Sequence, residues 1–558
     1  MSISNHIFLF PFTINDHSHN KNFMSDIDQK LKQNNWENIP FSPKGQDNTL
    51  LKNKNEAYSE YFYFHPFAQE AIFDTGRNAD QAVMKYYSRK LEPQKKNYFK
   101  LSVLAGKEKK DYELSIKNIA LRIYETQIGI LSIELSNTKE NELEDIIKIN
   151  EFGKRIYPQY LGPGGIKDTK KSFLANGIEF VLNCNEWSES FDNTDHFRQN
   201  HIVIASYVLN LLGKKIFSSN PDDEDKYTIH PTIDDRMYVI CWFGSNSYSC
   251  QFKHKHLYGK YVYESSPLWY RYIFHDGTDL FCQHDEMLKR LIKNTTYERW
   301  ANYGTLYGIS RYGLVCITDS EPMAQNVLKM HMRKQYAQMA HLLLAQRASI
   351  LRFSQKVSVI SGRIKEMETS DRGNQKKLKE IADDVGKLHA DYIRFVNRMW
   401  FTEITPQEQG IEMYEKAITN MRLKEDMSDL KNEIKELHEY TSNALEKRTS
   451  HSMNTLTTLG AIFLPLTLLT GLLGMNVLFV DNGIFKFFIE KFSTNPFWIN
   501  ISASIISLVI FYFACFVTFF MARKYIKDIK TGDNDILSYL ELRYLSFPWK
   551  KRSDVDDE

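Results

Sequence analysis

The sequence predicts an α+β domain of about 320 residues, followed by long helices and a hairpin of two membrane-spanning helices. Three observations predict this order. Short alternating apolar segments indicate strands in the first part of the chain. Apolar residues with a period of 3.5 indicate a long helix over residues 423–444. Two uncharged runs, residues 453–475 and 497–521, have the length of membrane spans.

Strand signals dominate residues 1–320, for which we expect a cytosolic sensor domain. Apolar residues alternate over 119–123 and again over 128–135, which predicts a hairpin. Residues 236–243 are typical of a buried strand, and residues 200–212 of a helix. The first apolar stretch has no basic segment before it, so we expect a buried first strand and no signal peptide. This mixture leaves α+β and α/β both open.

Composition excludes several classes of protein. The chain has 558 residues, 42% of them hydrophobic, and a mean hydropathy of −0.44, so most of its mass is expected to be water-soluble. A net charge of +2 provides no general attraction to nucleic acid, and no direct nucleic-acid partner is expected. Six cysteines without a CxxC pair indicate a reduced compartment. Without a P-loop, nucleophile elbow or HExxH motif, we expect no enzyme.

Long helices are expected after residue 320. Residues 321–405 predict a helical segment with two helices, over 321–366 and 375–397, and residues 406–452 a stalk helix that continues into the membrane. A 3.5-residue period in the stalk favours a coiled-coil seam, with an intramolecular bundle as the alternative. Joined to the first span, the stalk would be one helix of about 100 Å. The seam residues are Leu423, Met427, Leu430, Ile434, Leu437, Thr441 and Ala444.

The two uncharged runs predict a membrane hairpin. Basic residues precede the first span and follow the second, which orients the protein with both termini in the cytosol. Residues 476–496 would then be an extracytoplasmic loop, and residues 522–558 a cytosolic C-terminal tail. Because two helices cannot enclose a hydrated pore, a channel would need several subunits around an axis. The flanking basic residues are Lys447, Arg448, Arg523, Lys524, Lys527 and Lys530.

The stretch LTTLGAIFLPLTLLTGLLGMN, residues 456–476, resembles the first transmembrane helix of the CorA-type magnesium transporters. The resemblance implies a funnel-shaped homopentamer in the bacterial inner membrane, with Mg²⁺ as the transported and regulatory cation and the first helices lining the pore. It rests on Leu456, Thr457, Phe463, Pro465, Leu466, Thr467, Gly471, Gly474, Met475 and Asn476.

The same resemblance implies roles for single residues. Gly474, Met475 and Asn476 would form the outer mouth, where a ring of Asn476 amides accepts hydrogen bonds from the water shell of Mg²⁺. Thr467 and Gly471 would add polar rings below that mouth. Because Mg²⁺ releases water reluctantly, an uncharged mouth suits a hydrated ion. The hydrophobic gate implied by the resemblance consists of Met453, Leu456 and Leu464. Many family members have an acidic patch after Asn476. Here an apolar run, Val477 to Val480, takes its place, with Asp481 as a candidate for partial replacement, which puts both the transport rate and a strict Mg²⁺ preference in doubt.

The overall layout is also similar to the CorA-like proteins of type III CRISPR systems. That resemblance implies a channel opened by a nucleotide second messenger, an adenylylated S-adenosylmethionine, in antiviral defence. Two alternatives stay open: a housekeeping Mg²⁺ uptake channel gated by cytosolic Mg²⁺, and a membrane-anchored sensor that conducts nothing.

One segment of the first domain could bind such a messenger. Cations, rings and glycines interleave over residues 299–313, where they could stack a base and hold a phosphate. A packed strand-turn-strand is the alternative. The candidate residues are Arg299, Trp300, Tyr303, Arg311 and Tyr312.

No metal site is firmly assigned from the sequence. The spacing of the cysteines and histidines within residues 250–284 matches no zinc signature. The acidic pair Asp234 and Asp235 is expected in a solvated loop.

Overall fold

The structure is a computed structural model, and it divides into two units, Met1–Thr441 and Ser442–Glu558. It describes residues 3–16, 22–43, 51–105, 108–157, 164–192, 203–256, 259–277, 281–368 and 374–474, together with isolated positions between 505 and 520. Each unit is described by itself.

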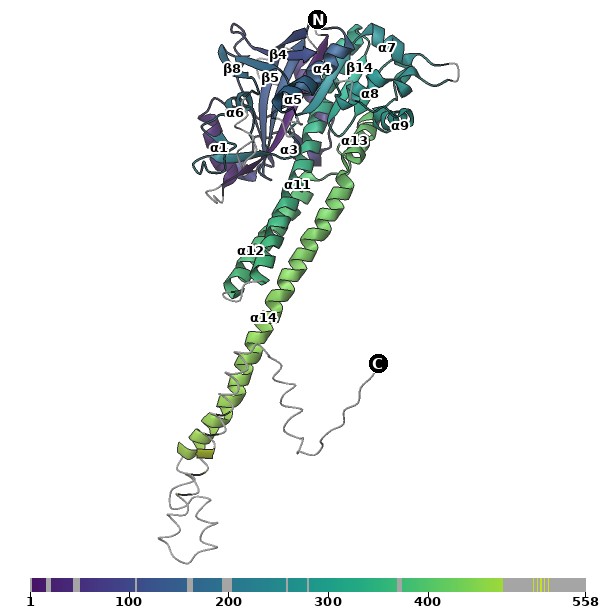
Figure 1. The fold of residues 1–558 in the computed structure, drawn as a ribbon. Coiled ribbons are helices and arrows are strands. Elements are labelled where there is room, and N and C mark those ends of the chain that lie inside the picture. Colours follow the sequence, from purple (N-terminus) through teal and green to yellow (C-terminus); the bar gives the residue numbers. More distant parts are fainter. Residues whose placement is uncertain are drawn as a thin grey trace, which may run out of the picture. The chain divides into compact units, whose positions relative to one another are not determined.

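Strands of the first unit form a mixed sheet, which among the described residues has 14 strands (Figure 1). Most neighbouring pairs are antiparallel, whereas β11 and β14 are parallel. The predicted hairpin is β5 and β6, and the predicted first strand is β1 at the centre of the sheet. The order is β12 (Thr296–Tyr297), β13 (Leu306–Ile309), β14 (Gly313–Thr318), β11 (Tyr238–Gly244), β1 (Ser4–Asn15), β6 (Ile128–Asn137), β5 (Glu108–Tyr124), β4 (Tyr98–Ala105), β7 (Gly177–Leu182) and β8 (Asn185–Glu189), with β10 (Tyr227–Pro231), β9 (Phe217–Ser218), β3 (Met84–Ser88) and β2 (Glu37–Asn38) at its sides.

Helices cover both faces of this sheet. Because most of its neighbouring strands are antiparallel, the α+β prediction is confirmed. Helices α1, α4, α6 and α8 pack on one face, and α3, α10 and α11 on the other. The helices of the first unit's sheet domain are α1 (Phe23–Lys32), α2 (Leu51–Phe62), α3 (Pro66–Ile72), α4 (Leu143–Gly153), α5 (Ile166–Ser172), α6 (Ser206–Leu212), α7 (Asn246–Lys253), α8 (Pro267–Phe274) and α9 (Asp285–Thr295).

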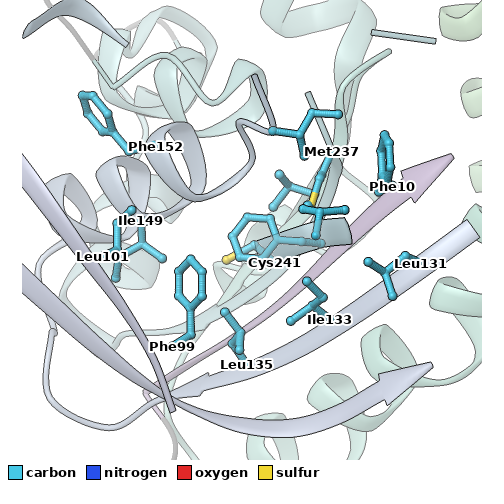
Figure 2. Close-up of a cluster of buried hydrophobic side chains, with 14 of the residues drawn as sticks. Phe10, Phe99, Leu101, Leu131, Ile133, Leu135, Ile149, Phe152, Met237 and Cys241 are labelled. Atoms are coloured by element: carbon cyan, nitrogen blue, oxygen red, sulfur yellow. The ribbon is translucent and has the colours of Figure 1, made fainter. Parts of the chain in front are cut away.

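Strand alternation separates the two faces chemically. Phe10 of β1 and Leu131, Ile133 and Leu135 of β6 point into an apolar core with Phe152 of α4 (Figure 2). Residues between them in the sequence point the other way, toward α11. This second face contains buried polar side chains, including Ser132, Glu134 and Arg122.

After the sheet domain come the long helices α10 (Lys329–Arg333), α11 (Gln335–Glu368), α12 (Asn374–Met399), α13 (Glu408–Met421) and α14 (Leu423–Gly474). Helix α12 runs antiparallel to α11 (Figure 1): the rings of Phe353 and Phe395 are in contact, with 5.5 Å between their centroids, and Arg363 pairs with Asp384 at 2.8 Å.

The predicted seam of the stalk is buried inside the chain itself. Leu430 and Ile434 of α14 are each 1% exposed in the single chain. His438 of α14 stacks on His389 of α12, with 4.8 Å between the ring centroids. A 3.5-residue period describes any helix that packs along a neighbour. The intramolecular bundle therefore explains the seam over Leu423–Thr441, and the coiled-coil interpretation is not needed there.

The helix predicted to run unbroken from residue 408 is divided at Arg422. This residue ends α13 with φ of 58° and ψ of 33°, in the left-handed region. Helix α14 alone has 52 residues, about 78 Å at 1.5 Å per residue. The helix predicted over 321–366 is also divided, at Lys334 between α10 and α11, after a π-helical turn over Ala324–Leu328.

Arg422→Gly is expected to stabilise the protein by roughly 1 kcal/mol, because a side chain costs about that much in the left-handed conformation and glycine does not. Thermal unfolding of the full chain in detergent checks this. Arg422→Val should lower the unfolding midpoint. An unchanged midpoint in both variants would contradict the claim that the left-handed conformation at residue 422 costs stability.

Among the described residues, no helix combines the length and the apolarity that crossing a membrane requires. The predicted loop 476–496 and tail 522–558 lie outside the described residues, as does nearly all of the predicted second span, 497–521.

A buried histidine makes the stability of the first unit depend on pH. The His6 Nδ1 atom lies 2.7 Å from Asn150 Oδ1, and burial lowers the pKa of His6 to about 4, although this hydrogen bond opposes the shift. Between pH 6.5 and 4 the unfolded chain therefore binds more protons at this site than the folded chain. The contribution of His6 to the free energy of unfolding is complete above pH 6.5 and decreases as the pH falls toward 4.

Comparison of wild type with His6→Gln tests this contribution. Glutamine keeps donor and acceptor atoms but does not titrate, so the wild type should lose about 2 kcal/mol relative to the variant between pH 7 and pH 5. Denaturant unfolding of the full chain in detergent, followed by tryptophan fluorescence, measures the difference. Parallel pH curves for the two proteins would contradict it.

Candidate functional site

The residues assigned to a pore share one face of α14. At about 100° per residue, Met453, Leu456, Leu464, Thr467 and Gly471 fall within an arc of about 80°. Gly460 and Gly474 lie in the same arc. Along the helix, the residues of this face change from large apolar side chains to threonine and glycine.

Large side chains of this face are uncovered in the single chain. Met453, Leu456 and Leu464 are 65%, 72% and 70% exposed. A Cβ atom added at Gly471 would meet nothing within 4 Å. A contiguous exposed apolar row of this kind indicates a surface that another molecule covers.

Hydroxyl groups of this helix donate to the helix itself. The Thr467 Oγ1 atom lies 3.1 Å from the carbonyl oxygen of Phe463 and 2.9 Å from that of Leu464. Thr457 and Thr458 bond in the same way to Met453 and Asn454. Donors satisfied within their own helix can lie in apolar surroundings at little cost. Two predicted mouth residues, Met475 and Asn476, lie outside the described residues.

The first two residues of the segment predicted to bind a ligand, residues 299–313, interact with side chains of α13. Arg299 pairs with Glu412 at 2.7 Å, and the Trp300 indole donates to Gln409 at 3.1 Å. Tyr303 is 71% exposed, and its ring lies 6.3 Å from that of Trp300. These three residues form one exposed patch beside α13.

Arg311 and Tyr312 lie elsewhere. They follow β13, whose four residues separate them from Tyr303 by about 13 Å of strand. The Arg311 carbonyl accepts a hydrogen bond from Arg347, and the Tyr312 ring lies under the guanidinium of Arg236 at 4.6 Å. The five predicted residues therefore do not gather around one ligand.

A wide basic cavity of about 890 Å³ opens beside Arg299. Stacked rings of Tyr261 and Tyr263 stand at its wall, with 5.3 Å between their centroids, and the Tyr261 hydroxyl bonds to Asn302 at 2.6 Å. Most of the basic residues that line this cavity were not predicted from the sequence. The spacing of three of them on α9 was the available signal, because Lys293 follows Lys289 by four residues and Arg290 by three, and such pairs are neighbours on a helix surface. The basic lining residues are His256, Lys260, Lys289, Arg290, Lys293 and Arg299.

The cysteine and histidine cluster does not form a metal site. The Cys250 Sγ atom lies 3.7 Å from His254 Nε2, a single contact on one turn of chain. Within the described ranges, no three or more side chains of His, Cys, Asp or Glu converge as metal ligands.

The acidic pair expected in a solvated loop is instead largely buried, so that prediction was wrong for Asp235, which is 2% exposed. It pairs with Arg155 at 3.2 Å, and burial together with the neighbouring Asp234 raises the pKa of Asp235 to about 6. Arg155 also pairs with Glu151, the partner of the buried Lys154. Interactions between distant segments bury this network, which no local pattern predicts.

Comparison with known proteins gives a match for one part of the chain, which contains most of the long helices. Residues 347–518 match the family model described as CorA-like Mg²⁺ transporter protein. No curated protein and no solved structure matches the chain. The match begins within α11, includes α12, α13, α14 and the first uncharged run, and ends three residues before the end of the second run.

Proposed function

Because residues 347–518 match the model of CorA-like Mg²⁺ transporters, we propose that the protein is a divalent-cation channel of the bacterial inner membrane. Residues 453–475 and 497–521 are its two spans, and both termini are cytoplasmic. Neither run contains a charged side chain, which supports this topology. Several copies, five by the family's pattern, surround the ion path.

The observation that carries the proposal is the single face of α14. Met453, Leu456 and Leu464 are exposed in one copy and would face one another around an axis of symmetry, where apolar rings can close a channel by dewetting. Thr467 and Gly471 continue the same face with small, polar or absent side chains. An assembly of copies therefore covers the exposed row and creates a path of changing polarity.

Asn476 forms the mouth of this path. Neutral amide oxygens accept hydrogen bonds from the water shell of Mg²⁺ without having to remove it. Because the following residues, Val477 to Val480, bear no acid, the mouth attracts cations weakly and also admits divalent cations other than Mg²⁺.

The first unit controls the gate. Two regulators are consistent with it: cytosolic Mg²⁺, and an anionic nucleotide messenger such as an adenylylated S-adenosylmethionine. The cavity beside Arg299 favours the second, because its five Lys and Arg side chains outnumber its three glutamates, Glu264, Glu286 and Glu298, and two tyrosine rings suit a base. Under that regulation, opening of the channel in infected cells would act as antiviral defence.

Cation flux into liposomes tests the proposal. Wild-type protein should carry Mg²⁺, and Asn476→Ala should reduce the flux roughly tenfold because the amide ring that holds the hydrated ion is lost. Asn454→Ala is the control, since this asparagine lies on α14 outside the proposed pore face. Absence of flux under every condition would leave the non-conducting sensor.

The same assay separates the regulators. Inhibition by Mg²⁺ on the cytosolic side alone favours housekeeping uptake. Activation by an adenylylated S-adenosylmethionine, lost in Lys289→Glu, favours the messenger.

A further inference from the structure

A second cavity, of about 360 Å³, lies on the polar face of the sheet in the first unit. Strands β1, β3, β5 and β6 form one wall, and α2, α10 and α11 contribute the other. It shares no lining residue with the basic cavity beside Arg299. Its volume is within the range of sites for small organic molecules.

Carboxylates in this cavity already have cationic partners. Glu134 pairs with Arg333, Glu60 with Lys334 at 3.3 Å, and Asp74 with Lys85 at 3.3 Å. These pairs neutralise the acidic side chains that line the site. An additional cation there is left without a counter-charge from the protein.

Arg122 is that cation. Its side chain extends from β5 into the cavity wall, and the residue is 5% exposed. It donates to the neutral Gln338 at 2.8 Å and lies 5.1 Å from the Tyr86 ring, but no carboxylate among the described residues pairs with it. Its Nε–H has no hydrogen-bond partner. A buried guanidinium in this state favours an incoming anion.

His341 adds a second unsatisfied group. It is 4% exposed, and its Nδ1 lies 2.6 Å from the carbonyl oxygen of Ala337, so Nδ1 carries the proton. Burial and the nearby Arg122 hold the pKa of His341 well below its ordinary value. The ring is therefore neutral, and its Nε2 atom, which has no partner, is an acceptor that needs a donor.

An apolar wall completes the site. Phe41 and Phe73 pack against each other with 4.4 Å between ring centroids, and Met84 lies beside them in the lining. Inorganic phosphate alone would leave this wall uncovered. A molecule with an organic body covers it.

We propose that this cavity binds a small organic oxyanion, whose anionic group accepts from Arg122 and whose adjacent hydroxyl donates to His341. A phosphate monoester and a 2-hydroxy acid share this chemistry. The occupant would lie against Arg333 and Lys334, at the division between α10 and α11. The site is independent of the proposed ion path.

The experiment uses the full chain in detergent and measures thermal unfolding with and without each probe at constant ionic strength. Phenyl phosphate and mandelate represent the two sources of the oxyanion, and 1-phenylethanol is the neutral control. At millimolar concentration at least one anion should raise the unfolding midpoint by about 2–4 °C, whereas the alcohol should not. Equal shifts with chloride and both anions would overturn the proposal.

Arg122→Met should remove the shift, because methionine keeps the volume without the charge. Arg352→Met is the matched control: Arg352 is also buried on this side of the sheet and has an unpartnered Nε, but it does not line the cavity. If Arg122→Met does not fold, His341→Phe tests the hydroxyl contact by reducing mandelate binding at least fivefold. Retention of the full shift in both cavity variants would contradict the assignment.

Hydrogen exchange provides a readout separate from stability. An anion that raises the unfolding midpoint should slow hydrogen exchange of the amides of residues 329–340 in the wild type. In Arg122→Met it should not change their exchange rates. Flux measurements do not enter this test, so its failure leaves the channel proposal intact.

Discussion

Gly471→Leu is expected to reduce cation flux at least tenfold while the protein still assembles. Gly471 lies in the same arc of α14 as Leu464 and Thr467, and nothing lies within 4 Å of the position that its Cβ would occupy in one copy. Around a symmetry axis, one added side chain per subunit narrows the path from every side. Because an ion must keep its water shell to pass, a reduction of a few ångströms in diameter is enough to stop it. Flux into liposomes, normalised to reconstituted protein, measures the effect.

Thr458→Leu is the control for this prediction. Thr458 lies on the opposite side of α14 and is close in size to leucine, so flux should change less than twofold. If the two variants lost flux equally, the pore face assigned to α14 would be wrong. If Gly471→Leu conducted normally, the ion path would not run along this helix.

Glu151→Gln is expected to destabilise the protein by about 3–5 kcal/mol, because it removes the counter-charge of a buried lysine. The Lys154 side chain is 2% exposed; its ammonium group donates to Glu151 and, at 3.0 Å, to the carbonyl oxygen of His275. Burial already lowers the pKa of Lys154 to about 8, with Glu151 opposing that shift. Without the carboxylate the pKa falls further, so the folded chain holds this proton less well than the unfolded chain. The destabilisation should therefore increase as the pH falls from 9 to 7.

A double variant, Glu151→Gln with Lys154→Met, separates charge from packing. Methionine fills the space of the lysine stem without a charge, so the double variant should recover most of the lost stability. Chemical denaturation of the full chain in detergent at pH 7 and pH 9 gives the comparison. Equal losses in the single and double variants would show that Glu151 acts through its bonds to Arg155 instead.

Local patterns were sufficient for the regular elements. The alternation over residues 119–135 corresponds to β5 and β6, and the helix predicted over 375–397 corresponds to α12. The helix predicted over 200–212 is shorter, since α6 begins only at Ser206. These patterns work because side-chain periodicity is a property of the element itself.

Divisions within long helices could not be predicted. Nothing in the residues around Arg422 forbids a helix, yet this residue adopts a left-handed conformation and separates α13 from α14. α13 packs on β13 through Asn420, whose amide bonds the Ile309 carbonyl at 2.7 Å. The chain changes direction because α13 packs on the sheet whereas α14 packs in the helical bundle. These tertiary contacts override the local preference for one continuous helix.

By itself, the sequence determined the first strand, the hairpin over residues 119–135, the strand over residues 236–243, the long helices, the uncharged runs and the tripeptide Gly474-Met475-Asn476. It determined them because period, charge and length are local properties of a chain. Only the tertiary structure decided that the stalk seam is buried within one copy, that Arg299 and Tyr312 lie at opposite ends of β13, and that Asp235 is buried. It alone brought Arg122 of β5 and His341 of α11 to the same cavity. These outcomes depend on contacts between segments that are distant in the sequence, such as those of Arg155 with Asp235 and of Arg122 with Gln338, and burial and charge compensation are properties of those contacts.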